Sequence, residues 1–445
     1  MNLHKLSLDT IPPILTPFRF FLSAPLFGVL AALLLLYSGD DFWLTRWSNT
    51  NLALTHLLTI GFMLMVMMGA LYQFIPVMNG QLIPGSKKLV AVIHVLMILG
   101  VLTMVSGFLS AYSELFQTAV AALGSATGLF ALSLLPLLIS RLGNQLIVYL
   151  LRVLFLVLLI TLGLGFFLLL GHALPELNLS YRLYTDLHAL WGLLGWVVLI
   201  IMAVSSQVIP MFYVISEFSP RYLKILPLVI MLTLLVMSFY TVISSKQSGT
   251  DSGQPFIYYT LAFLLSAELL VFVFYTLLKI AQRKRKIADV TINFYRLALF
   301  SLLAAILLWW AAVFFPLAHL TYLLAILLIY GLAISIINGM LHKIVSFLIF
   351  LHLQKQSLRR PEAMTLVPNM KQVISTRNSQ IQFMLHLLSG TLLLISVYYP
   401  ALTVLAAVIM LANFCWLSWC LFQAYLLYLR SRKKILACPE MSMSF

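Results

Sequence analysis

The sequence predicts an all-α polytopic membrane protein with about 12 transmembrane helices. Of its 445 residues, 62% are apolar and only 9% are charged, whereas soluble proteins carry about 25% charged residues. Apolar runs of about 20 residues recur along the chain, and each is long enough to cross roughly 30 Å of hydrocarbon as a helix. These runs lack the polar alternation of strands, so helices rather than a barrel are expected.

The predicted spans follow one another with short connections, so the chain reads as a single transmembrane domain over residues 1–445. Residues 353–380 form the longest polar stretch and are predicted to be a basic cytoplasmic loop. The spans, taken in order, are 18–37, 52–75, 89–112, 115–139, 145–171, 184–209, 222–245, 256–280, 292–315, 317–341, 381–399 and 401–429.

The net charge of +15 is distributed unevenly between the two sides of this topology. Basic residues gather in the connections on one side, and that bias predicts that this side and both termini are cytoplasmic. The charge therefore indicates orientation in a lipid bilayer, and no nucleic-acid partner is expected. The basic positions on this side include Lys5, Lys87, Lys88, Arg141, Arg221, the run 283–286, Arg359, Arg360 and the tail 430–434.

Histidines recur at a nearly constant interval. His56, His188 and His319 stand near the predicted outer ends of the second, sixth and tenth helices, 132 and then 131 residues apart. The interval predicts three four-helix units, over 18–139, 145–280 and 292–429, in a pseudo-threefold arrangement. The inner ends of the second and sixth helices also share a Gln-x-x-Pro motif, which is predicted to end both helices because proline lacks a backbone donor. These motifs are Gln73 to Pro76 and Gln207 to Pro210.

Three imidazoles at one depth could converge inside the bundle. Neutral imidazole is a common ligand of haem iron, copper and zinc, so His56, His188 and His319 are the candidate cofactor ligands. The alternative is that each histidine forms an ordinary hydrogen bond between helices. His172 is a reserve ligand on the same side, and the inner histidines are interpreted as structural, namely His94, His342, His352 and His386.

Through these histidines and the motifs named below, the chain resembles two related groups of membrane proteins. Histidines on helices 2, 6 and 10 of twelve resemble the haem–copper oxidase subunit I architecture. The stretch Pro17 to Leu22, then His56 with Gly61 and Phe62, and then Gly69 before Pro76 resembles NnrS. NnrS proteins are bacterial membrane proteins that contain haem and copper and are linked to nitric oxide stress.

The resemblance implies cofactors and a location. It implies a haem b with His56 and His319 as axial ligands, and it makes copper, held on the His188 side, a further candidate. It also implies the bacterial inner membrane, with respiratory or other membrane proteins as candidate partners. Residues 222–245 contain no histidine, and Leu320 and Thr321 follow His319. The chain therefore lacks the full oxygen-reducing binuclear centre of the oxidases.

A carboxylate and an arginine within the predicted spans are candidates for proton handling or for an ion pair. Glu268 lies deep in the eighth span, where an ionisable residue is costly and suggests function. Arg152 on the fifth span is its expected partner, with Arg296 as the alternative. A structural pair and a proton relay both remain open.

Three functions are compatible with these features. The first is a haem-binding membrane protein in nitric oxide response, electron transfer or cofactor handling. The second is a proton-coupled secondary transporter that uses Glu268, although repeats in transporters usually divide the helices into two halves. The third is an assembly or scaffold subunit without a cofactor. The sequence does not decide whether the protein is an enzyme.

Overall fold

The computed structural model confirms the predicted fold class. It describes residues 11–80, 83, 87–140, 144–177, 181–246, 254–283, 289–358 and 360–439, and these ranges contain helices and connections but no strand. Twelve of the helical segments in these ranges are long and apolar enough to cross a membrane. The protein is therefore a polytopic helical membrane protein. Among the basic positions above, Lys5, Arg141, Arg359 and residues 284–286 lie outside the described ranges.

The spans are described here in three sets of four. The first set contains α1 (Leu15–Ser38) with η3 (Gly39–Trp43), then α2 (Asn49–His56), η4 (Leu57–Leu64) and α3 (Met65–Asn79) as one span, α4 (Lys87–Ser110) and α5 (Ser113–Ile139). The second set contains α6 (Gln145–Ala173), then α7 (Tyr181–Leu190), η6 (Trp191–Val197) and α8 (Val198–Tyr213) as one span, α9 (Pro220–Lys246) and α10 (Gln254–Ala281). The third set contains α11 (Val290–Phe314), then α12 (Leu320–Ala325), η7 (Ile326–Ile334) and α13 (Ser335–Ser357) as one span, α15 (Thr376–Ser396) and α16 (Thr403–Ala437).

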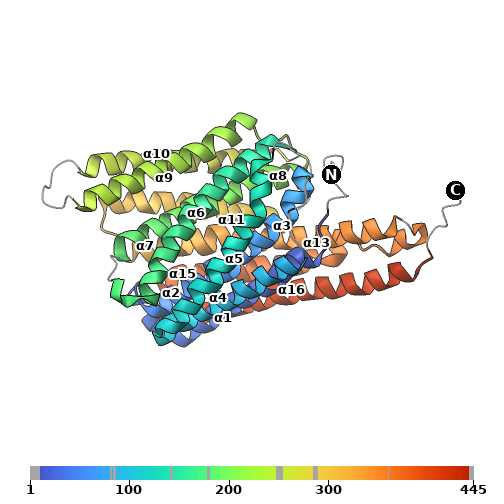
Figure 1. Cartoon of the computed structure of the whole chain (residues 1–445), viewed down its shortest axis with the longest axis horizontal. Coiled ribbons are helices and arrows are strands. Elements are labelled where there is room, and N and C mark those ends of the chain that lie inside the picture. Colours follow the sequence, from blue (N-terminus) through green and yellow to red (C-terminus); the bar gives the residue numbers. More distant parts are fainter. Residues whose placement is uncertain are drawn as a thin grey trace.

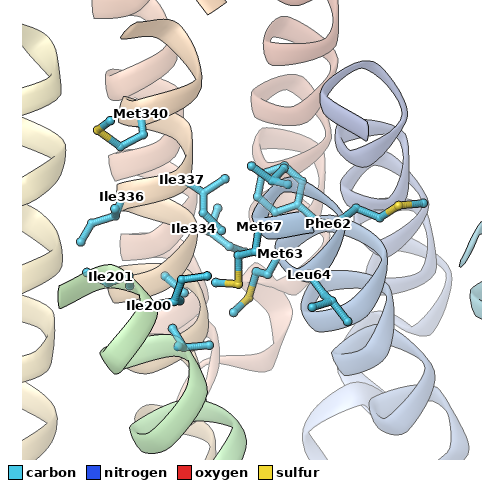
Figure 2. Packing of buried hydrophobic residues seen from close by; sticks show 14 of the residues in the cluster. Phe62, Met63, Leu64, Met67, Ile200, Ile201, Ile334, Ile336, Ile337 and Met340 are labelled. Carbon is cyan, nitrogen blue, oxygen red and sulfur yellow. The ribbon is translucent and has the colours of Figure 1, made fainter. Parts of the chain in front are cut away.

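The three sets are arranged as a closed ring. The last helix of each set packs against the first helix of the next, which pairs α5 with α6, α10 with α11 and α16 with α1. The second spans meet in the middle of the bundle. Figure 2 shows this centre, where Met63 of η4, Ile200 of α8 and Ile334 of η7 belong to the same buried cluster. Figure 1 shows that the helix axes are roughly aligned, and that α13 and α16 extend beyond most of the other helices.

Each second span contains one π-helical segment in its middle. The three segments are η4, η6 and η7, and each begins shortly after the histidine of its own set. Each also contains a glycine at which a Cβ atom would collide with the first helix of that set: 2.6 Å from Phe27 at Gly61, 3.0 Å from Val157 at Gly195 and 2.5 Å from Ser301 at Gly331. Such wide turns interrupt helices rarely and often lie at functional sites. The recurrence is what a threefold repeat would produce.

Three predicted helix ends are wrong. Pro76 and Pro210 do not end their helices, because α3 continues to Asn79 and α8 to Tyr213, where the next residue adopts a left-handed conformation. Proline is tolerated within membrane helices when neighbouring groups satisfy the freed carbonyl. The tenth span also continues beyond 341 to Ser357 because α13 packs along α16 there. The stretch predicted as a loop at 353–380 therefore begins in a helix, and it also contains η8 (Pro361–Leu366) and α14 (Met370–Val373).

Candidate functional site

A cavity of about 290 Å³ lies between the first and second sets of helices, at the end of the bundle that carries His56 and His188. We call it the histidine cavity. Its wall comes from α2, η4, α4, α5, α6 and α7, and most of its lining side chains are apolar, including Met104, Phe108 and Phe166. Three histidines line the cavity, namely His56, His172 and His188. A mainly apolar cavity with a few convergent polar groups is typical of a small-molecule site.

His56 and His188 face each other across this cavity. Their ring centroids are 6.5 Å apart and the ring planes are inclined by only 17°. Nδ1 of His56 lies 2.7 Å from the carbonyl oxygen of Leu52, and Nδ1 of His188 lies 3.0 Å from that of Thr161. A carbonyl oxygen can only accept, so each Nδ1 carries the proton and each neutral ring has its lone pair on Nε2. This is the arrangement by which a protein orients metal-ligating histidines.

Two neighbours of the pair fix its geometry. A Cβ atom at Gly165 would lie 2.8 Å from Cε1 of His188, so only glycine leaves room for that ring on α6. The ring of Phe108 stacks on His56 with centroids 5.6 Å apart, and its edge meets the ring of His172 at 5.4 Å. The reserve ligand His172 therefore belongs to the same site. The glycine was missed from the sequence, although Gly163 and Gly165 interrupt an otherwise apolar run.

The rim of the histidine cavity carries positive charge. Trp47 lines the cavity, and the guanidinium carbons of Arg46 and Arg182 lie 4.2 and 6.0 Å from its ring centroid. Arg46 also pairs with Asp186 at 2.9 Å, an exposed contact that stabilises the fold by at most about 1 kcal/mol. Guanidinium groups bind carboxylates in a bidentate manner. The rim can therefore hold an anionic group of a ligand whose apolar part enters the cavity.

The structure does not bring His319 to this pair. His319 precedes α12 in a left-handed conformation, with φ of 59°, and its ring meets Tyr398 and Tyr322 at 5.9 and 6.4 Å. Aromatic side chains occupy much of the space between α12 and α2 and leave only a small cavity there. Trp43 packs edge-on against Tyr322 at 5.2 Å, and its Nε1 donates to Thr403 at 2.7 Å. The structure therefore brings His56 together with His188, and His319 does not line the histidine cavity.

Glu268 and Arg152 also lie apart from each other. Glu268 is 6% exposed, and it accepts a hydrogen bond of 2.8 Å from the hydroxyl of Thr233 on α9. Arg152 lies on the surface of α6, where its Nε donates to the carbonyl of Leu138 at 2.7 Å. The ion pairs between described side chains are Arg46 with Asp186 and Lys343 with Asp289, so the expected pairing of Glu268 with Arg152 or Arg296 is not present among them.

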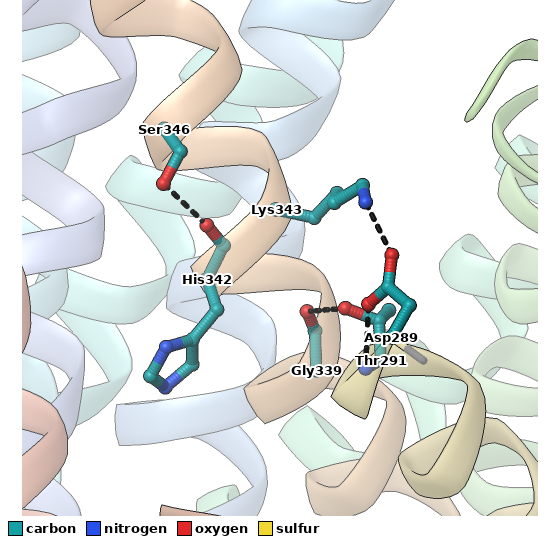
Figure 3. Close-up of polar contacts among 6 residues, drawn as sticks. All are labelled: Asp289, Thr291, Gly339, His342, Lys343 and Ser346. Carbon is teal, nitrogen blue, oxygen red and sulfur yellow. Dashed lines mark hydrogen bonds and ion pairs between the residues drawn. The ribbon is translucent and has the colours of Figure 1, made fainter. Parts of the chain in front are cut away.

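The inner histidines take different positions. His94 hydrogen-bonds Ser23 at 2.8 Å, which ties α4 to α1. His386 is 1% exposed and belongs to a polar network within the third set of helices. His342 of α13 lies beside Lys343, but Figure 3 shows that the two side chains leave the helix in different directions and that Lys343 reaches Asp289.

The donor set fits haem iron better than a metal held by protein alone. Among the residues that the structure describes, no three or more His, Cys, Asp and Glu side chains are grouped to hold a metal ion. Two imidazoles with centroids 6.5 Å apart leave room for one metal ion, since imidazole nitrogen binds metals at about 2 Å. A porphyrin would supply the remaining ligands. Because a porphyrin exceeds the cavity, side chains such as Met104 and Leu162 would have to turn aside to admit it.

Comparisons with known proteins leave the resemblance to NnrS as a hypothesis based on motifs and topology. No protein-family model matches the chain, and no curated protein is similar to it at a significant level. The family assignment therefore has no support beyond the residues quoted above, and the function has to be argued from the histidine cavity.

Proposed function

We propose that the protein binds haem in the histidine cavity, with His56 and His188 as the axial ligands. The observation that carries the proposal is the facing pair of imidazoles. Both rings are oriented by a bond from Nδ1 to a backbone carbonyl, which leaves the lone pair of each ring on Nε2, as in histidines that bind metals. Ionisable side chains within a membrane span are costly, so two partly buried imidazoles beside a cavity favour a binding site.

Three further features support haem over other ligands. The cavity wall is mainly apolar, which suits the porphyrin face. Arg46 and Arg182 at the rim suit two propionate carboxylates, because guanidinium binds carboxylates in a bidentate manner. Gly165 permits the position of the His188 ring. The resemblance to NnrS and to haem–copper oxidase subunit I points to the same cofactor.

The role that follows is electron transfer or cofactor handling in connection with nitric oxide stress. Bound haem would supply one-electron redox chemistry, while the protein determines which axial positions are filled. Two imidazoles from α2 and α7 would fill both axial positions. The positive-inside bias supports a position of this cavity on the side of the membrane away from the cytoplasm, which in a bacterial inner membrane would be the periplasmic side.

Optical spectroscopy of the purified protein from haem-replete cells tests this proposal. The dithionite-reduced protein is expected to show the sharp α band of a low-spin b-type haem, and His56→Ala and His188→Ala are expected to remove it. His319→Ala is the matched control, because it removes the third recurrent histidine without touching the cavity, and it should keep the band. A colourless and iron-free wild type, or loss of the band only in His319→Ala, would contradict the proposal.

Elemental analysis of the same preparations distinguishes haem from copper bound by the same rings. Copper would draw on the two imidazoles and on the thioether of Met104, which lines the same cavity. Iron in proportion to the protein, lost together with the α band, is the expected result. Copper in proportion to the protein without iron would assign the imidazoles to that metal instead.

A further inference from the structure

A buried network of polar side chains fills the core of the third set of helices. Among its members, Tyr330 is 3% exposed, His386 is 1% exposed, and Ser335, Asn338, Gln382, Ser389 and Asn413 have no exposed surface. These residues come from η7, α13, α15 and α16. Ionisable side chains at such depth are costly in a membrane and often mark the route of an ion or a proton, whereas uncharged polar side chains also join helices by hydrogen bonds.

The hydrogen bonds form a directed chain around His386. The amide nitrogen of Asn338 lies 3.3 Å from Nδ1 of the His386 ring, and Nε2 of that ring lies 2.8 Å from the hydroxyl of Ser335. Ser335 in turn donates to the backbone carbonyl of Tyr330 at 3.3 Å. An amide NH₂ group donates, so Nδ1 accepts and Nε2 donates onward. The imidazole thus has one partner on each nitrogen.

The phenol of Tyr330 lies beside this chain, which itself ends on the backbone carbonyl of Tyr330. The Tyr330 ring stacks on the His386 ring with centroids 4.4 Å apart. Its hydroxyl group bonds Ser389 and accepts from Asn413 at 3.1 Å, and Asn413 accepts from Gln382 at 2.8 Å. Two titratable side chains therefore lie in contact at the centre of the network.

Several polar atoms of this network have no protein partner within the described ranges. They are Oδ1 of Asn338, Nε2 of His342 and Oε1 of Gln382. Their side chains are at least nine-tenths buried. Buried polar atoms are almost always satisfied, and ordered water is the usual partner when no protein group is available. The network therefore has places for water, which carries protons between groups that do not touch.

The network reaches toward both ends of the bundle. At one end, Nδ1 of His342 lies 3.1 Å from the hydroxyl of Ser379, which is partly exposed near the start of α15. At the other end, Tyr330 lines a cavity of about 80 Å³ together with Asn51, Thr55 and Tyr322. Lys343 and Asp289 pair on another side of α13, as Figure 3 shows, and do not enter the network.

We propose that this network is a proton-conducting route through the third set of helices, from Ser379 and His342 through His386 to Tyr330 and the 80 Å³ cavity. A proton that binds one nitrogen of His386 releases the proton on the other nitrogen, so one proton enters and one leaves for each transfer. Water at the unsatisfied atoms of Asn338, His342 and Gln382 carries the proton between His342, His386 and the hydroxyl group of Tyr330, because amide groups and backbone carbonyls do not pass protons on. The route does not depend on haem, since none of its residues lines the histidine cavity.

Proton flux into vesicles tests the route. The full chain is reconstituted into vesicles of phosphatidylethanolamine and phosphatidylglycerol that contain a pH-sensitive dye, and valinomycin with a potassium gradient drives protons inward. Wild type should acidify the interior faster than protein-free vesicles do. His386→Ala should reduce the flux to the protein-free rate, and Tyr330→Phe should reduce it while keeping the ring that stacks on His386.

Tyr72→Phe is the matched control. Tyr72 is a buried tyrosine of α3 whose hydroxyl group bonds Ser133 at 3.2 Å, outside the proposed route. Vesicles with the Tyr72→Phe variant should show the proton flux of wild type. This result separates loss of the route from a general loss of packing. Gel filtration before reconstitution checks that each variant is folded. If folded wild type carries no more flux than protein-free vesicles, or if Tyr330→Phe conducts like Tyr72→Phe and wild type, the network is only structural.

Discussion

The seam between the first and second sets of helices and the seam between the third and first sets are built from corresponding spans but hold different contents. The first seam surrounds a cavity of about 290 Å³ with two facing imidazoles. The second seam has a cavity of only about 80 Å³, lined by Trp43, Tyr322 and Tyr330, and His319 is directed elsewhere. Two histidines at the same predicted depth in the membrane therefore do not necessarily meet. Whether they meet also depends on the volume that is left between their helices.

The largest effect is expected from a substitution that disturbs the first seam but keeps both of its facing histidines. In Gly165→Ala the new methyl group would lie 2.8 Å from Cε1 of His188, so the ring must move away from its position opposite His56. We expect most of the bound haem to be lost, as measured by the α band per protein. Gly163→Ala is the control on the same helix, because a Cβ atom at Gly163 has no neighbour within 4 Å. Equal haem content in both variants would show that the His188 ring is not a ligand.

The next effect concerns the second seam, where Trp43 packs against Tyr322. Trp43 is 5% exposed and bonded to Thr403, so Trp43→Ala should cost about 3–5 kcal/mol of unfolding free energy. Thermal unfolding in detergent measures this loss, and the α band of the folded fraction should not change. Leu44→Ala, at a neighbouring position that is 78% exposed, should leave stability unchanged. A lost α band in folded Trp43→Ala would mean that the second seam also contributes to the haem site.

A smaller effect is expected at the opposite end of the third set, far from both seams. Burial alone would raise the pKa of Asp289, but the ammonium of Lys343 and the hydrogen bonds of Thr291 keep that pKa below the ordinary value of an aspartate. Asp289→Asn should cost between the roughly 1 kcal/mol of a surface pair and the roughly 3 kcal/mol of a buried one. Its α band should match that of wild type.

The ion pair between Asp289 and Lys343 should also make the stability of the fold depend on pH. A carboxyl whose pKa is lowered by folding stabilises the folded state above the unfolded pKa, and this contribution is lost as the pH falls through the folded pKa. The difference in unfolding temperature between wild type and Asp289→Asn should therefore be full at pH 7 and shrink below pH 3.8. A difference that persists unchanged in acid would assign the loss to packing rather than to charge.

Hydropathy predicts the membrane fold because span length and composition are local properties. The twelve spans are confirmed, and so is the presence of His56 and His188 at one end of the bundle. The rotation of each helix about its own axis is not predicted, because helices that are apolar on all sides do not reveal which face is inside. For this reason the partner of His56, the partner of Glu268 and the network around His386 could be identified only in the structure. The predicted three-unit repeat stays a prediction, which the recurrent π-helical segments favour.

The most direct test of the account is the reduction potential of the bound haem after one axial histidine is replaced by methionine. A methionine ligand raises the potential of a haem iron relative to two imidazoles. His188→Met is therefore expected to raise the midpoint potential and to shift the α band, while His319→Met should match wild type in both. A wild-type spectrum and potential in His188→Met, or a raised potential in His319→Met, would contradict the assignment of His56 and His188 as the axial pair.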